Sequence, residues 1–339
     1  MTSALVLGGS VFVGRHLVTA LLDAGARVTV LNRGRTPTSL PTDIEQLVAD
    51  RTDASQMRAA LAGRTWDVVY DVSGFVMAAG GSDIDGLLDL LDGNVGRYVF
   101  VSSIMAYDQG LVGRFPWTED LPTNRDGPAS YGGFKAAAER TMLDRHGRTG
   151  FPATVVRPAA IYGPDNNIFD METPMFLRLL QRRPVLVPHG GLIVGSYGHV
   201  DDLCAAMLAL AAEPGAVGEV VNVTADAVDV NIYVATLAEV VGAEADVVPV
   251  PDELLADITT PVFGHLCKVR HHAMLDTTRA AAFGVAPRYR LLDGHRHTYE
   301  WFERQSWDRL DGPLADPLWK ASWDFGAEAA FAARVRARA

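Results

Sequence analysis

Cysteine is nearly absent from this sequence, since only Cys204 and Cys267 occur among 339 residues. Their spacing fits neither a disulfide framework nor a cysteine-based metal site, and is typical of a protein from the reducing cytoplasm. Cys204 falls in an apolar segment, residues 203–212, and is predicted to be a core residue. The C-terminal part contains more histidine, namely His265, His271, His272, His295 and His297. Because a metal site needs three or four convergent ligands, we expect no metal here.

Positive charge is also in deficit. The 30 lysines and arginines are outnumbered by 41 aspartates and glutamates, which gives a net charge of −11. This balance disfavours a general nucleic-acid-binding surface, so we expect no nucleic-acid partner. No apolar run reaches the ~18 residues that a transmembrane helix needs. Only residues 1–3 precede the first expected strand, without the basic region of a signal peptide, so we expect a cytoplasmic protein with no membrane partner.

The N-terminal part contains a pattern typical of dinucleotide-binding proteins. A short apolar run, residues 4–7, is followed by a glycine-rich turn over residues 8–14, an expected helix and a second apolar run at residues 27–31. Glycines let the backbone turn sharply and approach a ligand, and the helix directs its N-terminal N–H groups at a pyrophosphate. The pattern therefore predicts a dinucleotide cofactor bound by Gly8, Ser10, Phe12, Val13 and Gly14.

The residues after the second strand bear on the choice of cofactor. Asn32 stands where an acid usually binds the ribose diol, and Arg33 and Arg35 follow it. Because this loop has no carboxylate to repel a 2′-phosphate and has two guanidiniums to bind one, we predict NADP in preference to NAD. A solvated basic loop is the alternative interpretation.

The third expected strand, which closes at Asp50 and Arg51, is also assigned to the cofactor site. Asp50 is well placed to accept a hydrogen bond from the adenine amino group. The alternative is that Asp50 caps the helix expected to begin near Ala54.

Tyr131 and Lys135 lie four residues apart in an expected helix, so their side chains share one face. An ammonium beside a phenol favours the phenolate, so we expect Lys135 to lower the pKa of Tyr131 from about 10. Such a phenol suits proton transfer to or from an alcohol oxygen. The spacing alone is weak evidence, but it follows a dinucleotide-type opening and a strand that ends at Ser102 and Ser103.

Together these residues resemble the extended short-chain dehydrogenase/reductase family, of the NAD-dependent epimerase/dehydratase type, from Leu5 to about Arg304. The glycine motif of that family, Gly-x-x-Gly-x-x-Gly, is present without its middle glycine, because Val11 stands between Gly8 and Gly14. This form looks more like an atypical branch that includes reductase-like proteins and chloroplast stem-loop-binding relatives.

The resemblance implies catalytic roles for three residues. Tyr131 would exchange the proton on the substrate oxygen, Ser103 would hydrogen-bond that oxygen, and Lys135 would bind the nicotinamide ribose. A hydride would pass between the substrate carbon and the nicotinamide. The family's Arg-Pro-x-Asn-x-Tyr-Gly-Pro run is similar to residues 155–164. The resemblance also implies further cofactor contacts from Ser73, Pro158 and Ile161.

Two departures limit what the resemblance implies about the substrate. Ala160 replaces an asparagine that contacts the substrate in many relatives. Ile104 and Met105 replace the Asp-Glu pair of sugar 4,6-dehydratases, which argues against their standard mechanism. Family resemblance favours a sugar, sugar-nucleotide or nucleoside-like polyol. Epimerisation, elimination and net reduction stay open, and the alternative is a non-catalytic nucleotide-sensing or RNA-binding protein.

The alternation of elements predicts an α/β fold, a Rossmann-type doubly wound parallel sheet with a smaller C-terminal substrate-binding lobe. Strands are expected near residues 4–7, 27–31, 45–49, 67–71, 97–101 and 153–157, and helices near 13–24, 54–61, 82–92 and 131–146. Residues 1–160 form the predicted dinucleotide-binding domain, to whose sheet a strand near 219–223 returns. Residues 161–310 form the lobe, and the tail, 311–339, packs as a terminal helix or contributes to a homodimer.

Overall fold

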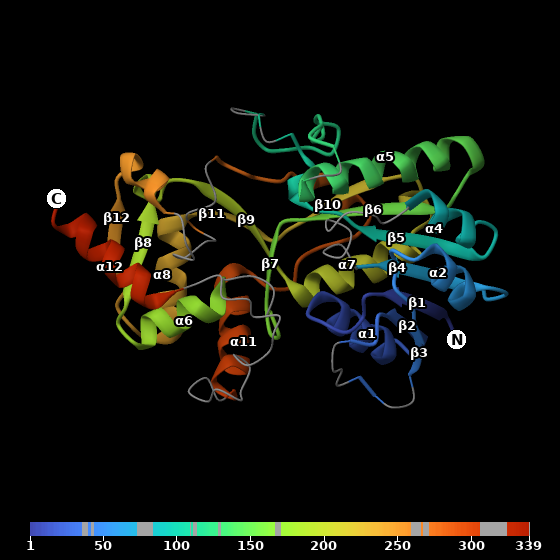
Figure 1. Cartoon of the computed structure of the whole chain (residues 1–339), viewed down its shortest axis with the longest axis horizontal. Helices are drawn as coiled ribbons and strands as arrows, with labels where there is room; N and C mark the ends of the chain where they lie inside the picture. Colours follow the sequence, from blue (N-terminus) through green and yellow to red (C-terminus); the bar gives the residue numbers. More distant parts are fainter. Residues whose placement is uncertain are drawn as a thin grey trace. The chain divides into compact units, whose positions relative to one another are not determined.

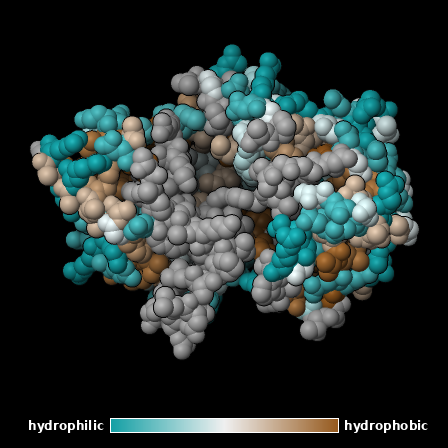
Figure 2. All heavy atoms as spheres, viewed as in Figure 1, coloured by the Kyte–Doolittle hydropathy of each residue, from teal (hydrophilic) through white to brown (hydrophobic). Residues whose placement is uncertain are grey.

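The structure of this protein, a computed structural model, describes residues 1–35, 40–41, 44–72, 84–108, 110, 114–127, 130–166, 171–258, 266, 271–305 and 324–338. The chain folds into two compact units (Figure 1). Unit 1 comprises Met1–Ala159, Val200–Thr224 and Leu275–Pro287. Unit 2 comprises Ala160–His199, Ala225–Met274 and Arg288–Ala339. In Figure 2, hydrophilic residues cover much of the described surface on the face shown, and apolar residues form smaller patches.

Seven parallel strands form the sheet of unit 1, in the order β10-β6-β5-β4-β1-β2-β3. Their bounds are β1 (Ser3–Leu7), β2 (Arg27–Asn32), β3 (Glu45–Val48), β4 (Trp66–Asp71), β5 (Val95–Val101), β6 (Ala153–Pro158) and β10 (Val220–Val223). Both β1 and β6 are buried at every residue, as is typical of central strands in a parallel sheet. The predicted Rossmann-type sheet is confirmed. Its strand order reverses between β1 and β4, where such sheets bind ligands.

Helices cover both faces of this sheet. They are α1 (Val13–Asp23), α2 (Ala54–Leu61), α4 (Ile84–Leu91), α5 (Tyr131–Thr149), α7 (Val200–Ala212) and the short α10 (Thr278–Ala282). The apolar sides of α2, α4 and α5 share one core with the sheet, and α1 packs against α7. Cys204 in α7 is buried, as predicted, and its Sγ lies 3.8 Å from the Val13 carbonyl oxygen. The four predicted helices are therefore present within the described residues.

Unit 2 is built around two small sheets, one of β11-β9-β7 and one of β12-β8. Its strands are β7 (Ala160–Tyr162), β8 (Pro184–Pro188), β9 (Val194–His199), β11 (Asp226–Asp229) and β12 (Asp246–Val250). Its helices are α6 (Glu172–Leu180), α8 (Val230–Val241), α11 (Leu291–Glu303) and α12 (Phe325–Arg336). The helices α6, α8 and α11 share one apolar core.

The C-terminal helix α12 belongs to unit 2. Phe331 and Val335 pack in an apolar cluster with residues of β8 and β12. Glu328 forms an ion pair with Arg178 of α6, and both side chains are almost fully buried. Residues 325–336 thus pack as a terminal helix, which was one of the two alternatives for the tail. Trp319 and Trp323 lie outside the described residues.

Apart from the strand near 219–223, which was expected in the main sheet, two segments within the predicted lobe belong to unit 1. They are α7 and residues 275–287. The strand β10 pairs with β6, as expected, and α7 leads into it. Residues 275–287 return to the same unit, because the Asp276 amide donates to the Trp117 carbonyl at 2.9 Å and Arg279 pairs with Glu219 at 3.0 Å. Among the described residues, no helix is both long and apolar enough to span a bilayer.

Candidate active site

The turn between β1 and α1 has the geometry of a ligand cradle. Gly8 adopts φ 97°, which favours glycine, and its amide donates to the Leu31 carbonyl at 3.0 Å. A Cβ added at Gly14 would lie 2.1 Å from the Gly8 carbonyl oxygen, so the first turn of α1 packs directly on the loop. Among the described residues, α1 has neither a side-chain cap nor an acid in its first turn. Its N-terminal N–H groups therefore suit a pyrophosphate.

We predict that Gly14→Ala weakens dinucleotide binding. The added methyl group must displace the Gly8 backbone, and overpacking of this kind costs about 1–3 kcal/mol. If all of that falls on binding, the dissociation constant rises about 5- to 200-fold. Calorimetric titration with NADH and NADPH measures the effect. Gly147→Ala in α5 is the matched control, because its Cβ meets nothing within 4 Å. Unchanged cofactor affinity in Gly14→Ala would show that the loop does not contact the cofactor.

The end of β2 is tied to this loop. The Asn32 side-chain amide donates to Ser10 Oγ at 2.8 Å, and its oxygen accepts from the Gly34 amide at 2.8 Å. Arg33 and Arg35 are exposed next to it. Asn32 thus shapes the loop from which the two predicted phosphate-binding arginines project.

A carboxylate that follows the third strand lies near these arginines. Asp50 Oδ2 is 3.7 Å from Arg35 Nη2. Hydrogen bonds from Thr52 lower the pKa of Asp50, with a smaller effect of Arg33 and Arg35. The alternative role of Asp50 as a helix cap is wrong, because Asp53 accepts from the first amides of α2. The adenine contact of Asp50 stays a prediction.

Arg51 has a buried partner that the sequence analysis did not assign. Its Nη1 and Nη2 donate to the two carboxylate oxygens of Asp71 at 2.5 and 2.6 Å, and the Tyr98 hydroxyl donates to Asp71 at 2.6 Å. All three residues are buried, and Asp71 ends β4 at the carboxyl edge of the sheet. An acidic residue that directly follows the apolar residues of this strand was the available signal. The cofactor role of Arg51 stays a prediction, and Ser73 lies outside the described residues.

The structure brings the three predicted catalytic residues together in unit 1. Ser103 follows β5, and its hydroxyl is near enough to the phenol of Tyr131, the first residue of α5, to lower the pKa of that phenol. Lys135 is buried one turn further on, where its ammonium donates to the Val101 carbonyl at 2.5 Å. The Lys135 Nζ lies 5.8 Å from the centre of the Tyr131 ring. A substrate oxygen near the two hydroxyls would have both a hydrogen-bond donor and a proton carrier.

The expectation that Lys135 lowers the pKa of Tyr131 is wrong for this structure. Burial raises the pKa of the Tyr131 phenol above 10, and the hydrogen bond with Ser103 offsets part of this rise. Burial also lowers the pKa of Lys135 to about 8, partly offset by the carboxylate of Asp71. The Lys135 ammonium is directed at the Val101 carbonyl. Desolvation is the largest effect on the pKa of both Tyr131 and Lys135.

The last two predicted cofactor residues lie at the point where the chain leaves the sheet. Pro158 is the final residue of β6 and pairs with Val223 of β10. Ile161 is in β7 and is buried in unit 2. Their cofactor contacts stay predictions. The cavity found in unit 1, of about 460 Å³, is at the amino ends of the strands beside Arg27, Glu45 and Arg64, so it does not contain the predicted site.

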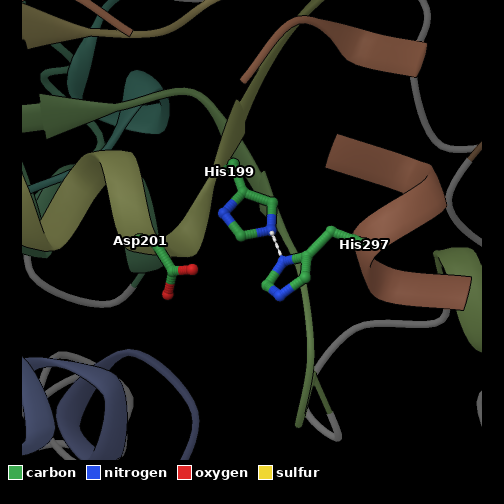
Figure 3. A group of neighbouring side chains, drawn as sticks. All are labelled: His199, Asp201 and His297. Carbon is green, nitrogen blue, oxygen red and sulfur yellow. Dashed lines mark hydrogen bonds between the residues drawn. The ribbon is translucent and has the colours of Figure 1, made fainter. Parts of the chain in front are cut away.

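The histidines of unit 2 mostly have protein partners. His297 Nδ1 lies 3.2 Å from Nε2 of the buried His199 (Figure 3). His295 is buried and stacks on Tyr162 at 4.0 Å, and burial lowers its pKa to about 4. The amide of Val194 donates to His272 Nδ1 at 3.1 Å.

The chain is similar in sequence to known proteins over most of its length. The model of the NAD dependent epimerase/dehydratase family matches residues 4–224. Ceramide reductase of Caulobacter vibrioides is 28% identical over 331 residues, which cover 89% of this chain and 95% of that enzyme. The chloroplast stem-loop binding protein of 41 kDa b of Arabidopsis thaliana is 28% identical over 235 residues. That match covers 66% of this chain and 58% of the Arabidopsis protein.

A solved structure supports the fold. The dTDP-glucose 4,6-dehydratase of Bacillus anthracis, solved in complex with NAD, superposes with a TM-score of 0.72 at 20% identity. The superposition covers 90% of this chain and 97% of that enzyme. At this identity the likeness concerns the fold alone.

Proposed function

Because the chain belongs to the NAD-dependent epimerase/dehydratase family, we propose that it moves a hydride between NAD(P) and a secondary alcohol or ketone through Ser103, Tyr131 and Lys135. The observation that carries this proposal is that Ser103 acts on the Tyr131 phenol, and that the buried Lys135, one helical turn away, has its Nζ 5.8 Å from the centre of the Tyr131 ring. The glycine cradle before α1 fits a dinucleotide. When bound, the nicotinamide supplies or accepts the hydride.

The three side chains divide the proton chemistry. Tyr131 gives its proton to the substrate oxygen during reduction, or takes it during oxidation. Ser103 donates a hydrogen bond to the same oxygen and stabilises its developing charge. Lys135, with a pKa of about 8, is mostly protonated at neutral pH and supplies a positive charge near the phenol. A polar ligand that leaves the phenol less desolvated would bring the pKa of Tyr131 down toward the working range.

For the substrate, we propose a sugar, a sugar nucleotide or a nucleoside-like polyol, which membership of the epimerase/dehydratase family favours. A lipid-type ketone is the second candidate, because the Caulobacter relative that aligns over 95% of its own length is a ceramide reductase. Ile104 and Met105 follow Ser103 in place of an acidic pair, which favours epimerisation or net reduction over the standard 4,6-elimination.

Two measurements on the purified protein test this function. The first is the ultraviolet and mass spectrum of nucleotide released on denaturation; retained NAD(H) would favour epimerisation or elimination, and an empty site would favour an exchanging reductase. In the second measurement, the protein and each cofactor are mixed with a panel of sugar nucleotides and ketones. The absorbance of the nicotinamide and the mass of any product are then monitored. Failure to bind any nicotinamide dinucleotide would contradict the proposal.

We predict that the protein binds NADPH more tightly than NADH, and that Arg33→Ala narrows the difference mainly by weakening NADPH. Charge-assisted bonds to a 2′-phosphate contribute roughly 1.5–3 kcal/mol each, and the exposure of Arg33 favours the low end, about 10-fold. Calorimetric titration measures both affinities. Arg27→Ala is the matched control, because Arg27 begins the strand that Arg33 follows. Equal affinities in the wild type would mean that the arginines are merely solvated.

RNA binding is an alternative function, which the resemblance to the chloroplast stem-loop binding protein favours. The net charge of −11 opposes it, since nucleic-acid affinity depends on neutralising phosphates with basic side chains. A gel-shift titration with stem-loop RNA at physiological salt distinguishes the two functions. Micromolar or tighter binding without turnover on any substrate would favour the binding function.

A further inference from the structure

Three side chains of α5 reach the carboxyl end of β5 from successive helical turns. Tyr131, Lys135 and Glu139 are spaced four residues apart, so they lie on one helix face. Tyr131 lies beside Ser103, Lys135 donates to the Val101 carbonyl, and Glu139 accepts a hydrogen bond from the Ser102 hydroxyl. The three partners are consecutive, and the third bond involves no residue of the proposed catalytic set.

Glu139 is also bound from the next strand. Arg157 of β6 donates through Nε to both carboxylate oxygens, at 3.0 and 3.2 Å, and through Nη2 at 2.7 Å. Glu139 is 1% exposed and Arg157 is 2% exposed. The remaining Nη1 of Arg157 donates to the Glu119 carbonyl at 3.1 Å, and its guanidinium lies 4.4 Å from the centre of the Tyr107 ring. One carboxylate therefore joins α5, β5 and β6 in the interior.

A buried ion pair of this kind is weak evidence for stability alone. Its desolvation cost offsets much of its attraction, and apolar residues of similar volume often stabilise a fold at least as well. A role in geometry accounts better for the position of Glu139. It lies one turn beyond Lys135 and bonds to the residue immediately before Ser103, so a shift of α5 along β5 would break its bonds first.

We propose that Glu139 is a positioning residue, which clamps α5 to the ends of β5 and β6 and so holds the Tyr131 phenol at Ser103 and the Lys135 ammonium at Val101. The inference rests on the proposed function for its effect on turnover. A displacement of about 1 Å in a catalytic group can cost on the order of 100-fold in rate. The clamp is therefore expected to act on kcat more than on cofactor affinity.

The clamp also acts electrostatically on Lys135. Burial lowers the pKa of Lys135 to about 8, while the negative charges of Asp71 and Glu139 raise it and Arg51 lowers it further. Because the pKa lies within the range where the protein can be titrated, the ammonium reports on its carboxylate neighbours. The sequence contains only three lysines, Lys135, Lys268 and Lys320, so labelled lysine gives three assignable signals.

The experiment compares Ser102→Ala and Glu139→Gln with the wild type. Lysine labelled with ¹³C at Cε is titrated by NMR, Lys135→Arg assigns the signal, and melting temperature, kcat and KM are measured alongside. Ser102→Ala removes one bond and keeps all charges, so kcat should fall about 10-fold or more. The KM for the cofactor should stay near wild type. Glu139→Gln should also lower the pKa of Lys135, because a negative charge that raised it is gone.

Glu328→Gln is the matched control, because Glu328 forms a buried pair with Arg178 but belongs to α12 of unit 2. It should lower the melting temperature and leave both kcat and the pKa of Lys135 unchanged. Wild-type kcat in Ser102→Ala and Glu139→Gln, at a melting temperature lowered as in Glu328→Gln, would overturn the proposal. If no substrate is found, the titration decides: a Lys135 pKa unchanged in Glu139→Gln would also overturn it.

Discussion

Replacing Tyr131 by phenylalanine should lower turnover by at least ~100-fold, the scale of general acid–base catalysis, while cofactor affinity stays close to wild type. The substitution removes the hydroxyl that lies beside Ser103 and keeps the aromatic ring. Since no other phenol is placed at Ser103 by the described contacts, the substrate oxygen loses its proton carrier. Steady-state kinetics with the identified substrate and calorimetric titration of the cofactor measure the two effects separately.

Tyr70→Phe is the control for the loss of a buried hydroxyl. Tyr70 is buried in β4 of the same sheet, and its neighbour Asp71 points to the opposite face. This variant should retain turnover. Wild-type turnover in Tyr131→Phe would remove Tyr131 from the reaction, whatever the stability of either variant.

Replacing Asp71 by alanine should destabilise unit 1 by about 3–5 kcal/mol, the usual cost of leaving a buried charge without its partner. The guanidinium of Arg51 would lose both of its bonds to Asp71, and the Tyr98 hydroxyl would lose an acceptor. Urea unfolding monitored by circular dichroism measures the loss. The double variant Arg51→Met with Asp71→Leu should recover much of it, because neither charge is then left unpaired.

Asp67→Ala is the matched control on the same strand. Its carboxylate accepts from the Ser3 amide at 2.7 Å but is open to solvent, so water can replace the lost contact. The expected loss of stability is therefore much smaller than for Asp71. A loss in Asp71→Ala no larger than in Asp67→Ala would show that the buried pair contributes little net stability.

Local patterns were sufficient to predict the sheet, and they also led to three candidate catalytic residues that the structure places near one another. Continuous apolar runs identify parallel strands because these strands are buried on both faces. Helical spacing brings Tyr131 and Lys135 to one face, and the order of a Rossmann-type sheet brings Ser103 to them. The glycine turn at residues 8–14 could be predicted because its function depends on backbone freedom.

The buried ion pairs could not be predicted in this way. Arg51 and Asp71 are 20 residues apart, and Glu139 and Arg157 are 18 residues apart, and no local spacing links them. The prediction that the pKa of Tyr131 is lowered was wrong for a related reason. Desolvation of the phenol depends on the packing around it, which local spacing does not reveal. The return of residues 275–287 to unit 1 also depends on contacts between distant segments.

The most direct test of the central claim follows the hydride itself. The wild-type protein is given its substrate with reduced cofactor deuterated at C4 of the nicotinamide, and product and cofactor are analysed by mass spectrometry. We predict that deuterium is delivered to a carbon that carries the substrate oxygen, and that Tyr131→Phe binds the same cofactor but transfers no label. For a net reduction, product without deuterium would contradict hydride transfer at this site. For an epimerisation, run with oxidised cofactor and a substrate deuterated at its carbinol carbon, loss of that deuterium to the solvent would contradict it.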